Sequence, residues 1–218
     1  MNKEIYNTLR NRIIYLDYEP GLILKEQTLA EEFGVSRTPL RTVLFRLEWE
    51  HLVKILPRTG ILIMELELSS ITNVFQARLE LEAVIGTMAA ERMNRDRLDR
   101  LIKLQSDCEA LKDNIAPRAL GDLDMANKQL FHESAGNPFL IEMSERLYSL
   151  TFRLWYFNML KMDRTTWNLE VDAVQEDLVI LADLLRKGTP EETGRARKEQ
   201  LLKHLKRIRS SFLGLTGL

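Results

Sequence analysis

The chain has 218 residues, of which 45% are hydrophobic and 29% are charged, and its formal net charge is −1. This length allows one large domain or two small ones, and the balanced charge gives no whole-chain signature of a nucleic-acid partner. The single cysteine, Cys108, excludes an internal disulfide and fits a reducing cytoplasm. The longest apolar run, at 147–162, is interrupted by charged residues. It is shorter than the roughly 20 apolar residues that span a bilayer, so we expect a cytoplasmic protein with no membrane partner.

The first predicted element is an amphipathic helix over residues 5–14, ended by a Pro/Gly turn at 18–21. Residues 29–47 then show two short helical patterns separated by Gly34. In the second pattern apolar residues recur at i, i+3, i+4 and i+7, which predicts one buried face. Two short helices around a tight turn are typical of a helix-turn-helix, whose second helix places its N-terminal end in a DNA major groove. The sequence therefore predicts a DNA-binding element.

The start of the second helix carries the residues that this prediction needs. Ser36 stands at the N-cap position, where its hydroxyl is expected to accept a hydrogen bond from a first-turn amide. Residues 36–47 contain three arginines, Arg37, Arg41 and Arg46, and no acidic residue. Arginine pairs in a bidentate manner with guanine O6 and N7. The alternative for such a charge cluster is an ordinary solvated helix face.

Two β-rich runs follow at 53–56 and 61–64, joined by a Pro/Gly turn at 57–60. This pattern predicts a β-hairpin, and a hairpin directly after a recognition helix is the wing of a winged helix-turn-helix. Arg58 lies at the predicted tip, where it is placed to reach a backbone phosphate or the minor groove. The alternative for Arg58 is a solvated loop residue.

Beyond about Ser69 the strand signal disappears and helical patterns separated by Gly/Pro turns continue to the end. The predicted segments are roughly 70–93, 95–114, 118–135, 138–161, 165–187 and 190–212. Antiparallel helices of this length form a bundle with room for a site between facing side chains. The expected fold class is mainly α, with a winged helix-turn-helix domain at 1–67 and an antiparallel six-helix bundle at 68–218.

Several motifs together carry a family resemblance. They are Glu19-Pro-Gly21, Leu29-Ala-Glu-Glu-Phe-Gly-Val-Ser-Arg-Thr-Pro-Leu-Arg41, Leu47-Glu-Trp-Glu-His-Leu-Val53, Arg78-Leu-Glu-Leu-Glu82, and Leu123-Asp-Met-Ala126 with Gly136-Asn-Pro-Phe-Leu140. On these motifs the chain resembles the GntR superfamily of bacterial transcription regulators, and within it the FadR subfamily with an FCD-type effector domain. The count of six helices resembles the shorter, VanR-like branch.

The resemblance implies a homodimer whose winged domains read an inverted-repeat DNA operator. It also implies that a small organic acid binds the helical domain and, in the simplest case, releases a repressor from DNA. The residues predicted at the DNA interface are Ser36, Arg37, Thr38, Arg41, Arg46, Arg58 and Gly60. Gln27 departs from the family pattern, because some relatives have a phosphate-binding arginine there. His51 replaces the usual glycine at the end of the recognition helix.

Many members of this family hold a divalent metal in the helical domain through one Asp and three His. In this chain those positions fall on Asp124, Lys128, Asp177 and His204, so two of the four ligands are replaced. A second register aligns His132 with the family's first His, but it needs a four-residue deletion and puts Lys128 at the Asp position. In either register the ligand set is incomplete.

Asp124, Lys128 and His132 are four residues apart and therefore form one ridge of a helix. A charged lysine has no lone pair and repels a cation. We hypothesise that the site holds no metal, or holds one weakly, and that it binds an anionic effector instead. The residues predicted for effector binding are Arg78, Asp124, Lys128, Asp177 and His204. The competing hypothesis keeps Zn, Mn or Ni on mixed N/O ligands, namely Asp124, His132, Asp177 and His204.

Two further function classes stay open. One is a helical metal-dependent hydrolase or oxidase that uses these same four ligands, with the winged segment as an accessory module. The sequence has no glycine-rich phosphate loop, nucleophile elbow or HExxH motif in support of it. The other is a DNA-binding protein that responds to no metabolite. The expectation is a ligand-responsive DNA-binding regulator and not an enzyme.

Overall fold

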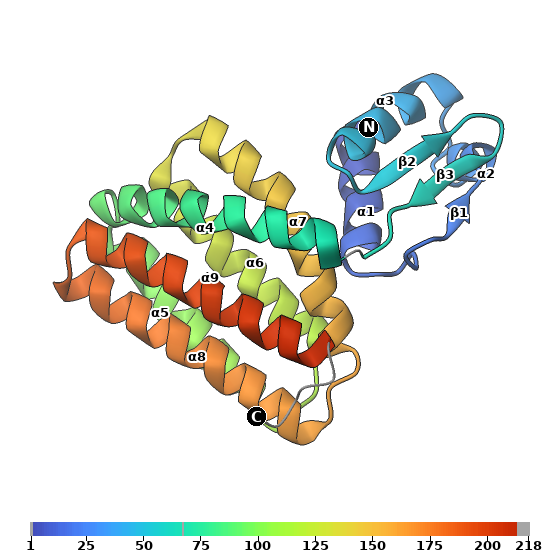
Figure 1. The fold of residues 1–218 in the computed structure, drawn as a ribbon. Coiled ribbons are helices and arrows are strands. Elements are labelled where there is room, and N and C mark those ends of the chain that lie inside the picture. Colours follow the sequence, from blue (N-terminus) through green and yellow to red (C-terminus); the bar gives the residue numbers. More distant parts are fainter. Residues whose placement is uncertain (1, 67, 213–218) are drawn as a thin grey trace. The chain divides into compact units, whose positions relative to one another are not determined.

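A computed structural model describes residues 2–66 and 68–212 (Figure 1). In these residues the chain forms nine helices and three strands. It divides into two compact units, one of Met1–Thr72 with Tyr148–Leu154 and one of Asn73–Leu147 with Trp155–Leu218. The domain boundary expected from the sequence falls at Glu67, which lies outside the described residues.

The first unit contains the winged helix-turn-helix. Its elements are α1 (Asn2–Ile14), β1 (Ile23–Leu24), α2 (Glu26–Glu32), α3 (Arg37–Trp49), β2 (Val53–Leu56) and β3 (Gly60–Ile63). The strands form an antiparallel sheet in the order β1-β3-β2, with Val53 opposite Ile63 and Ile23 opposite Leu62. The predicted hairpin is thus confirmed. Strand β1 was not predicted, because two residues are too short to show an alternating pattern.

The predicted buried face of α3 is also confirmed. Leu40, Val43, Leu44 and Leu47 are all buried, and α3 packs against α1 and α2. Ser36 is the N-cap residue of α3 with an extended backbone, but its side chain makes no capping hydrogen bond. The expected capping bond is therefore wrong, although the helix begins where the sequence places it.

Helices α2 and α3 end in the same backbone pattern. The left-handed residue is Gly34 (φ 62°) after α2 and His51 (φ 60°) after α3. In both cases the amides of this residue and the next donate to carbonyls of the last helical turn, at 2.9–3.2 Å. This is the Schellman motif, in which glycine is the preferred left-handed residue. His51 adopts the same conformation with a Cβ, which costs free energy.

The second unit is the predicted six-helix bundle. Its helices are α4 (Leu68–Glu91), α5 (Arg95–Glu109), α6 (Pro117–Ala135), α7 (Pro138–Met159), α8 (Arg164–Lys187) and α9 (Pro190–Phe212). Helix α8 packs against α5 and α9, and α5 packs against α6 (Figure 1). The turn before α7 has Gly136 in the left-handed conformation (φ 62°) and Asn137 as a cap that accepts from two amides. In the sequence, the same Gly and Asn separate the predicted helices at 118–135 and 138–161.

Residues 148–154 of α7 belong to the first unit by contact. Arg153 is buried there and its Nη2 donates to the carbonyl of Met64 at 2.7 Å, while Tyr15 packs edge-on against Phe152. Burial lowers the pKa of Arg153 to about 10. Sequence patterns did not predict that a bundle helix would contribute to this unit.

Across the described chain, no helix combines the length and apolarity needed to span a membrane.

Candidate DNA-binding surface and effector-domain clusters

The N-terminal end of α3 presents its polar residues to solvent. Ser36, Arg37, Thr38 and Arg41 are all exposed, while the opposite face of the helix is buried. The first amides of a helix have no intrahelical acceptors and carry a partial positive charge. Arginines and free amides at one exposed helix end form a surface that suits a phosphate backbone and base edges.

Arg41 already has a partner in this surface. Its Nε lies 2.6 Å from Glu26 Oε1 and its Nη2 lies 3.2 Å from Glu26 Oε2. Glu26 is in the first turn of α2, so the pair links the two helices of the helix-turn-helix. The side chain of Arg41 remains 58% exposed, which leaves its guanidinium accessible. The contact with Glu26 was not predicted from the sequence.

Arg46, another predicted DNA contact, lies in the second half of α3. Its guanidinium carbon is 3.9 Å from the centre of the Tyr6 ring, and its Nε is 3.3 Å from Glu50 Oε1. The hydroxyl of Tyr6 donates to the same buried carboxylate at 2.6 Å. Burial and this bond raise the pKa of Tyr6. Arg46 thus holds α1 against α3, and its role in DNA contact stays a prediction.

The wing tip contains a non-glycine residue with a positive φ. The amide of Thr59 donates to the carbonyl of Leu56 at 3.1 Å, which closes a turn around Pro57 and Arg58. Arg58 has φ 63°, as the second central residue of a type II turn requires. The turn leaves Arg58 exposed at the wing tip, and its contact with DNA stays a prediction.

Gly60 and Lys25 complete the wing. Gly60 has φ 148°, and a Cβ at this position would collide with the carbonyl of Leu24 in the neighbouring strand. Gly60 therefore supports the wing by allowing close strand approach. Lys25 Nζ donates to the carbonyl of Thr59 at 2.9 Å, which brings a further cation to the wing. Sequence reasoning missed Lys25, because no local pattern relates it to a turn 34 residues later.

Three polar clusters among the described helices each centre on a carboxylate. In the first, Glu82 of α4 is buried, its Oε1 accepts from Ser144 Oγ at 3.2 Å, and Arg78 Nη2 lies 3.5 Å from the same oxygen. Arg197 of α9 contacts Glu82 Oε2 and lies over the ring of Phe131. Burial alone would raise the pKa of Glu82, but the charges of Arg197 and Arg78 outweigh it and lower the pKa to about 2. We name these residues the Glu82 cluster.

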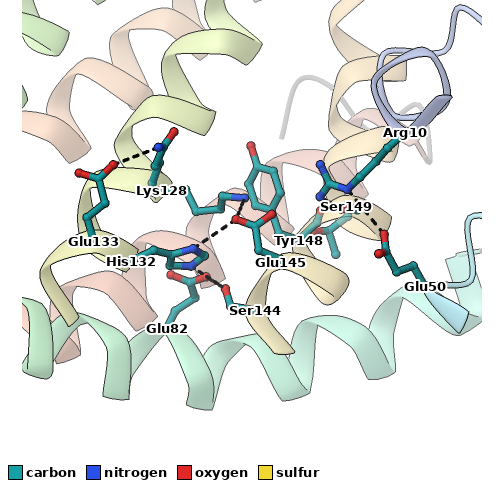
Figure 2. A network of polar contacts seen from close by, with 12 residues as sticks. Arg10, Glu50, Glu82, Lys128, His132, Glu133, Ser144, Glu145, Tyr148 and Ser149 are labelled. Carbon is teal, nitrogen blue, oxygen red and sulfur yellow. Dashed lines mark hydrogen bonds and ion pairs between the residues drawn. The ribbon is translucent and has the colours of Figure 1, made fainter. Parts of the chain in front are cut away.

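The second cluster joins α6 to α7 and consists of Lys128, His132 and Glu145 (Figure 2). Lys128 Nζ donates to Glu145 Oε1 at 2.6 Å, and His132 Nδ1 lies 3.3 Å from the same oxygen. On its other side, His132 Nε2 is 3.1 Å from Ser144 Oγ. We name these three residues the Glu145 cluster; Ser144 connects it to the Glu82 cluster.

The third cluster lies between α7, α8 and α9. Buried Glu170 accepts from Trp155 Nε1 at 2.9 Å and from Arg207 Nε at 3.0 Å. His204 Nδ1 lies 3.7 Å from Glu170 Oε1, and its ring packs edge-on against Trp155. Burial alone would raise the pKa of Glu170, but its contacts with His204 and Arg207 lower it to about 2. These four residues are the Glu170 cluster.

The predicted effector residues are distributed among these clusters. Arg78 is in the Glu82 cluster, Lys128 in the Glu145 cluster and His204 in the Glu170 cluster. Asp124 and Asp177 are half-buried, and burial raises the pKa of Asp177. Glu82, Glu145 and Glu170, which centre the clusters, were not among the predicted site residues. The i, i+4 spacing of Arg78 and Glu82 is visible in the sequence and is also compatible with an ordinary helix ion pair.

The predicted metal ligands do not assemble into a metal site. Among residues 2–66 and 68–212, no group of three or more His, Cys, Asp or Glu side chains could hold a metal ion. His132 faces Ser144 and Glu145, whereas His204 faces Glu170 and Arg207. The ligand set that the competing hypothesis requires therefore does not fit the observed arrangement.

Comparison with known sequences gives an independent result. The pattern described as "Bacterial regulatory proteins, gntR family" matches residues 1–63, and the pattern described as "FCD domain" matches residues 73–206. These two matches cover the winged helix-turn-helix and most of the helical bundle.

Curated relatives are transcription regulators. The chain is 26% identical over 193 residues to the HTH-type transcriptional repressor GlaR of Escherichia coli, covering 84% of this chain and 85% of GlaR. It is 29% identical over 195 residues to the HTH-type regulator YieP of the same organism, covering 80% and 84%. A 127-residue match to the gluconate operon repressor of Bacillus subtilis is 34% identical and covers 58% of this chain and 50% of that protein.

Solved structures agree with the fold. The E. coli McbR/YncC structure aligns over 97% of this chain and 98% of that chain with a TM-score of 0.84 at 18% identity. A GntR regulator from Rhodococcus sp. RHA1 aligns over 96% and 97% with a TM-score of 0.74 at 17% identity. With the sequence matches to both domains and the exposed basic end of α3, the conclusion is that this chain belongs to the gntR family of bacterial regulatory proteins with an FCD domain, and is a DNA-binding transcription regulator and not an enzyme.

Proposed function

We propose that this regulator is a cytoplasmic repressor that binds an inverted-repeat operator as a symmetric homodimer and leaves it when a small carboxylate binds the helical domain. The observation that carries the DNA-binding part is the exposed N-terminal end of α3, where Arg37 and Arg41 face solvent while Leu40 and Leu44 are buried. Two-fold symmetry of the protein would be matched by two-fold symmetry of the operator.

Within the winged unit the contacts divide by type. Arg37 and Arg41 are assigned to base edges and neighbouring phosphates, and Thr38 to a phosphate. Arg58 and Lys25 at the wing are assigned to the DNA backbone or minor groove, because both are exposed cations near the same turn. Base contacts would determine sequence preference, whereas the wing cations would contribute affinity for any sequence.

The effector is assigned to the helical domain as an anion. Two features support an anionic effector: Lys128 is a nearly buried ammonium, and the Glu82 and Glu145 clusters bring three basic side chains to two carboxylates. For such a ligand to act as an inducer, it must bind better to the form of the dimer that does not bind DNA. DNA then weakens effector binding by the same factor.

The DNA part is tested with operators selected from a random-sequence duplex pool by the wild-type protein. Arg37→Ala and Arg41→Ala should each weaken binding to the selected DNA by about 5- to 100-fold in fluorescence anisotropy. Arg95→Ala, which removes an exposed arginine from the first turn of α5, is the matched control and should bind like the wild type. Wild-type affinity in both α3 variants would contradict the assignment of the recognition surface.

The effector part is tested with a panel of small carboxylates in the same assay. One or more should release wild-type protein from the selected DNA, and Lys128→Met should bind DNA normally but lose this response. Sedimentation or light scattering of the free protein checks the dimer. DNA affinity that no carboxylate changes would instead favour a regulator that responds to no metabolite of this class.

A further inference from the structure

Glu145 is a partly exposed carboxylate that contacts two buried nitrogen groups. Its Oε1 accepts from Lys128 Nζ at 2.6 Å and lies 3.3 Å from His132 Nδ1. The side chains of Lys128 and His132 are only 8% and 4% exposed, whereas that of Glu145 is 37% exposed. The cluster is therefore two buried nitrogen groups reached from the solvent side by a carboxylate (Figure 2).

The hydrogen bonds that link His132 through Ser144 to Glu82 indicate which ring nitrogen of His132 carries a proton. Glu82 is ionised at neutral pH and can only accept, so the single hydroxyl proton of Ser144 is donated to Glu82. Ser144 then accepts from His132, and Nε2 of His132 carries a proton. The other ring nitrogen, Nδ1, makes no hydrogen bond in the described part of the chain, although it is buried. Nδ1 faces Glu145 Oε1 and can donate to a carboxylate only when the ring is in its imidazolium form, so Lys128 is the constant donor at this position.

A buried ammonium also requires an anion. Breaking a buried ion pair by removing one partner is strongly destabilising, so Lys128 favours a carboxylate at the position that Glu145 occupies. Glu145 is the more exposed member of its pair and can rotate toward water at lower desolvation cost than Lys128 can. An external carboxylate could then take its position without leaving Lys128 uncompensated.

We propose that Glu145 is an internal competitor of the effector: its carboxylate occupies the anion position formed by Lys128 and His132, and the effector binds by displacing it with a carboxylate of its own. This proposal rests on the proposed effector site in the helical domain. A tethered carboxylate has a high effective concentration at its own site, so a simple anion such as acetate does not displace it. The effector must add further contacts, and Glu145 thereby excludes abundant small acids.

The test is chemical rescue of Glu145→Ala by acetate. Removal of the side chain should lower Tm and leave room for a small carboxylate beside Lys128. Sodium acetate, added at constant ionic strength in place of sodium chloride, should then raise Tm of this variant saturably and recover about half or more of the loss. The wild type should show no comparable rise.

Two variants supply the controls. Glu142→Ala removes an exposed carboxylate from the same helix, one turn earlier, and should not respond to acetate. Lys128→Met/Glu145→Ala removes the ammonium as well and should lose the rescue. A rise of equal size in all four proteins, or no rise in Glu145→Ala, would overturn the proposal.

Folding itself can serve as the readout if Glu145→Ala is unstable. The variant should then refold from denaturant in acetate but not in chloride, and failure in both salts would contradict the proposal. The selected-DNA assay separates this inference from the proposed function. If Glu145→Ala shows no rescue while the wild type binds the selected DNA and is released by a carboxylate, only the role of Glu145 is rejected. If the wild type selects no DNA sequence, the proposed function itself is rejected.

Discussion

Arg41 of the recognition helix is held in a two-point ion pair by Glu26 of the preceding helix, at 2.6 Å and 3.2 Å. A fork-to-fork contact of this kind fixes the plane of the guanidinium as well as its position. Exposed pairs contribute little to folding stability. The consequence of this pair is therefore expected in DNA recognition and not in the stability of the fold.

Glu26→Gln should change affinity and specificity in opposite directions. Removing a negative charge next to the DNA should strengthen binding to random-sequence duplex, because electrostatic attraction dominates non-specific binding. Loss of the orienting carboxylate should lower the ratio of the affinity for the selected duplex to that for random-sequence duplex by about 5-fold or more. The reason is that a bidentate base contact depends on the plane of the Arg41 guanidinium. Anisotropy titrations with both duplexes measure this ratio, and an unchanged ratio would show that Glu26 does not orient Arg41.

Arg58→Gly should stabilise the protein while it weakens DNA binding. Arg58 has φ 63°, and a left-handed conformation costs a residue with a Cβ roughly 1–2 kcal/mol. Glycine removes this cost, so the free energy of unfolding should rise by about 1 kcal/mol. Loss of a phosphate contact should lower the slope of log affinity against log salt by about 1. Urea unfolding and salt titrations measure the two effects; a stability gain with full DNA affinity would remove Arg58 from the interface.

The two Schellman turns allow a matched test of backbone strain. Gly34 and His51 have φ values of 62° and 60°, and a Cβ at Gly34 would meet nothing within 4 Å. Alanine should therefore be about 1 kcal/mol less stable than glycine at each position, although the natural residue is histidine at one of them. A comparison of His51→Gly with His51→Ala tests the backbone conformation alone, because neither variant has the imidazole. Equal urea midpoints for Ala and Gly at position 51 would contradict the strain.

Stability should fall in acid because of Glu82 and Glu170. In the folded protein the pKa of each carboxyl is lowered from 4.5 to about 2. A lowered pKa contributes stability that is present above the unfolded pKa and is lost as pH falls through the folded one. The loss should therefore occur between about pH 4.5 and pH 2, and Tm should decrease across this window.

Glu170→Gln isolates one part of this dependence. The variant should be less stable than the wild type at pH 7, because Arg207 keeps its charge and loses its ionised partner. The difference in Tm should shrink as pH falls from about 4.5 toward 2, where the wild-type carboxyl also becomes neutral. A difference that is independent of pH would mean that the charge of Glu170 does not contribute. Glu176→Gln, at an exposed site on the same helix, is the control.

Much of the fold could be predicted because its signals are local. The apolar spacing of Leu40, Val43, Leu44 and Leu47 defines one face of a helix, and that face is buried. Gly136 and Asn137 separate two helices through a left-handed turn and a cap, both of which involve neighbouring residues. The exposed residues at the start of α3 follow from the same pattern. In contrast, β1 escaped prediction because its two residues pair with β3 some 38 positions away.

The sequence by itself determined the buried faces, the basic end of the recognition helix and most helix boundaries to within about three residues, since each depends on residues within one or two turns. The predicted helix at 95–114 was too long, because α5 ends at Glu109. Tertiary structure alone decided which charges meet. Glu145 reaches Lys128 across 17 positions, Glu82 reaches Arg197 across 115, and Lys25 reaches the wing across 34. These pairs depend on the rotation and packing of whole elements, and periodicity specifies only that a face is polar. The sequence therefore indicated Lys128 as a candidate contact for an anion, but it did not indicate Glu145 as the carboxylate that pairs with Lys128.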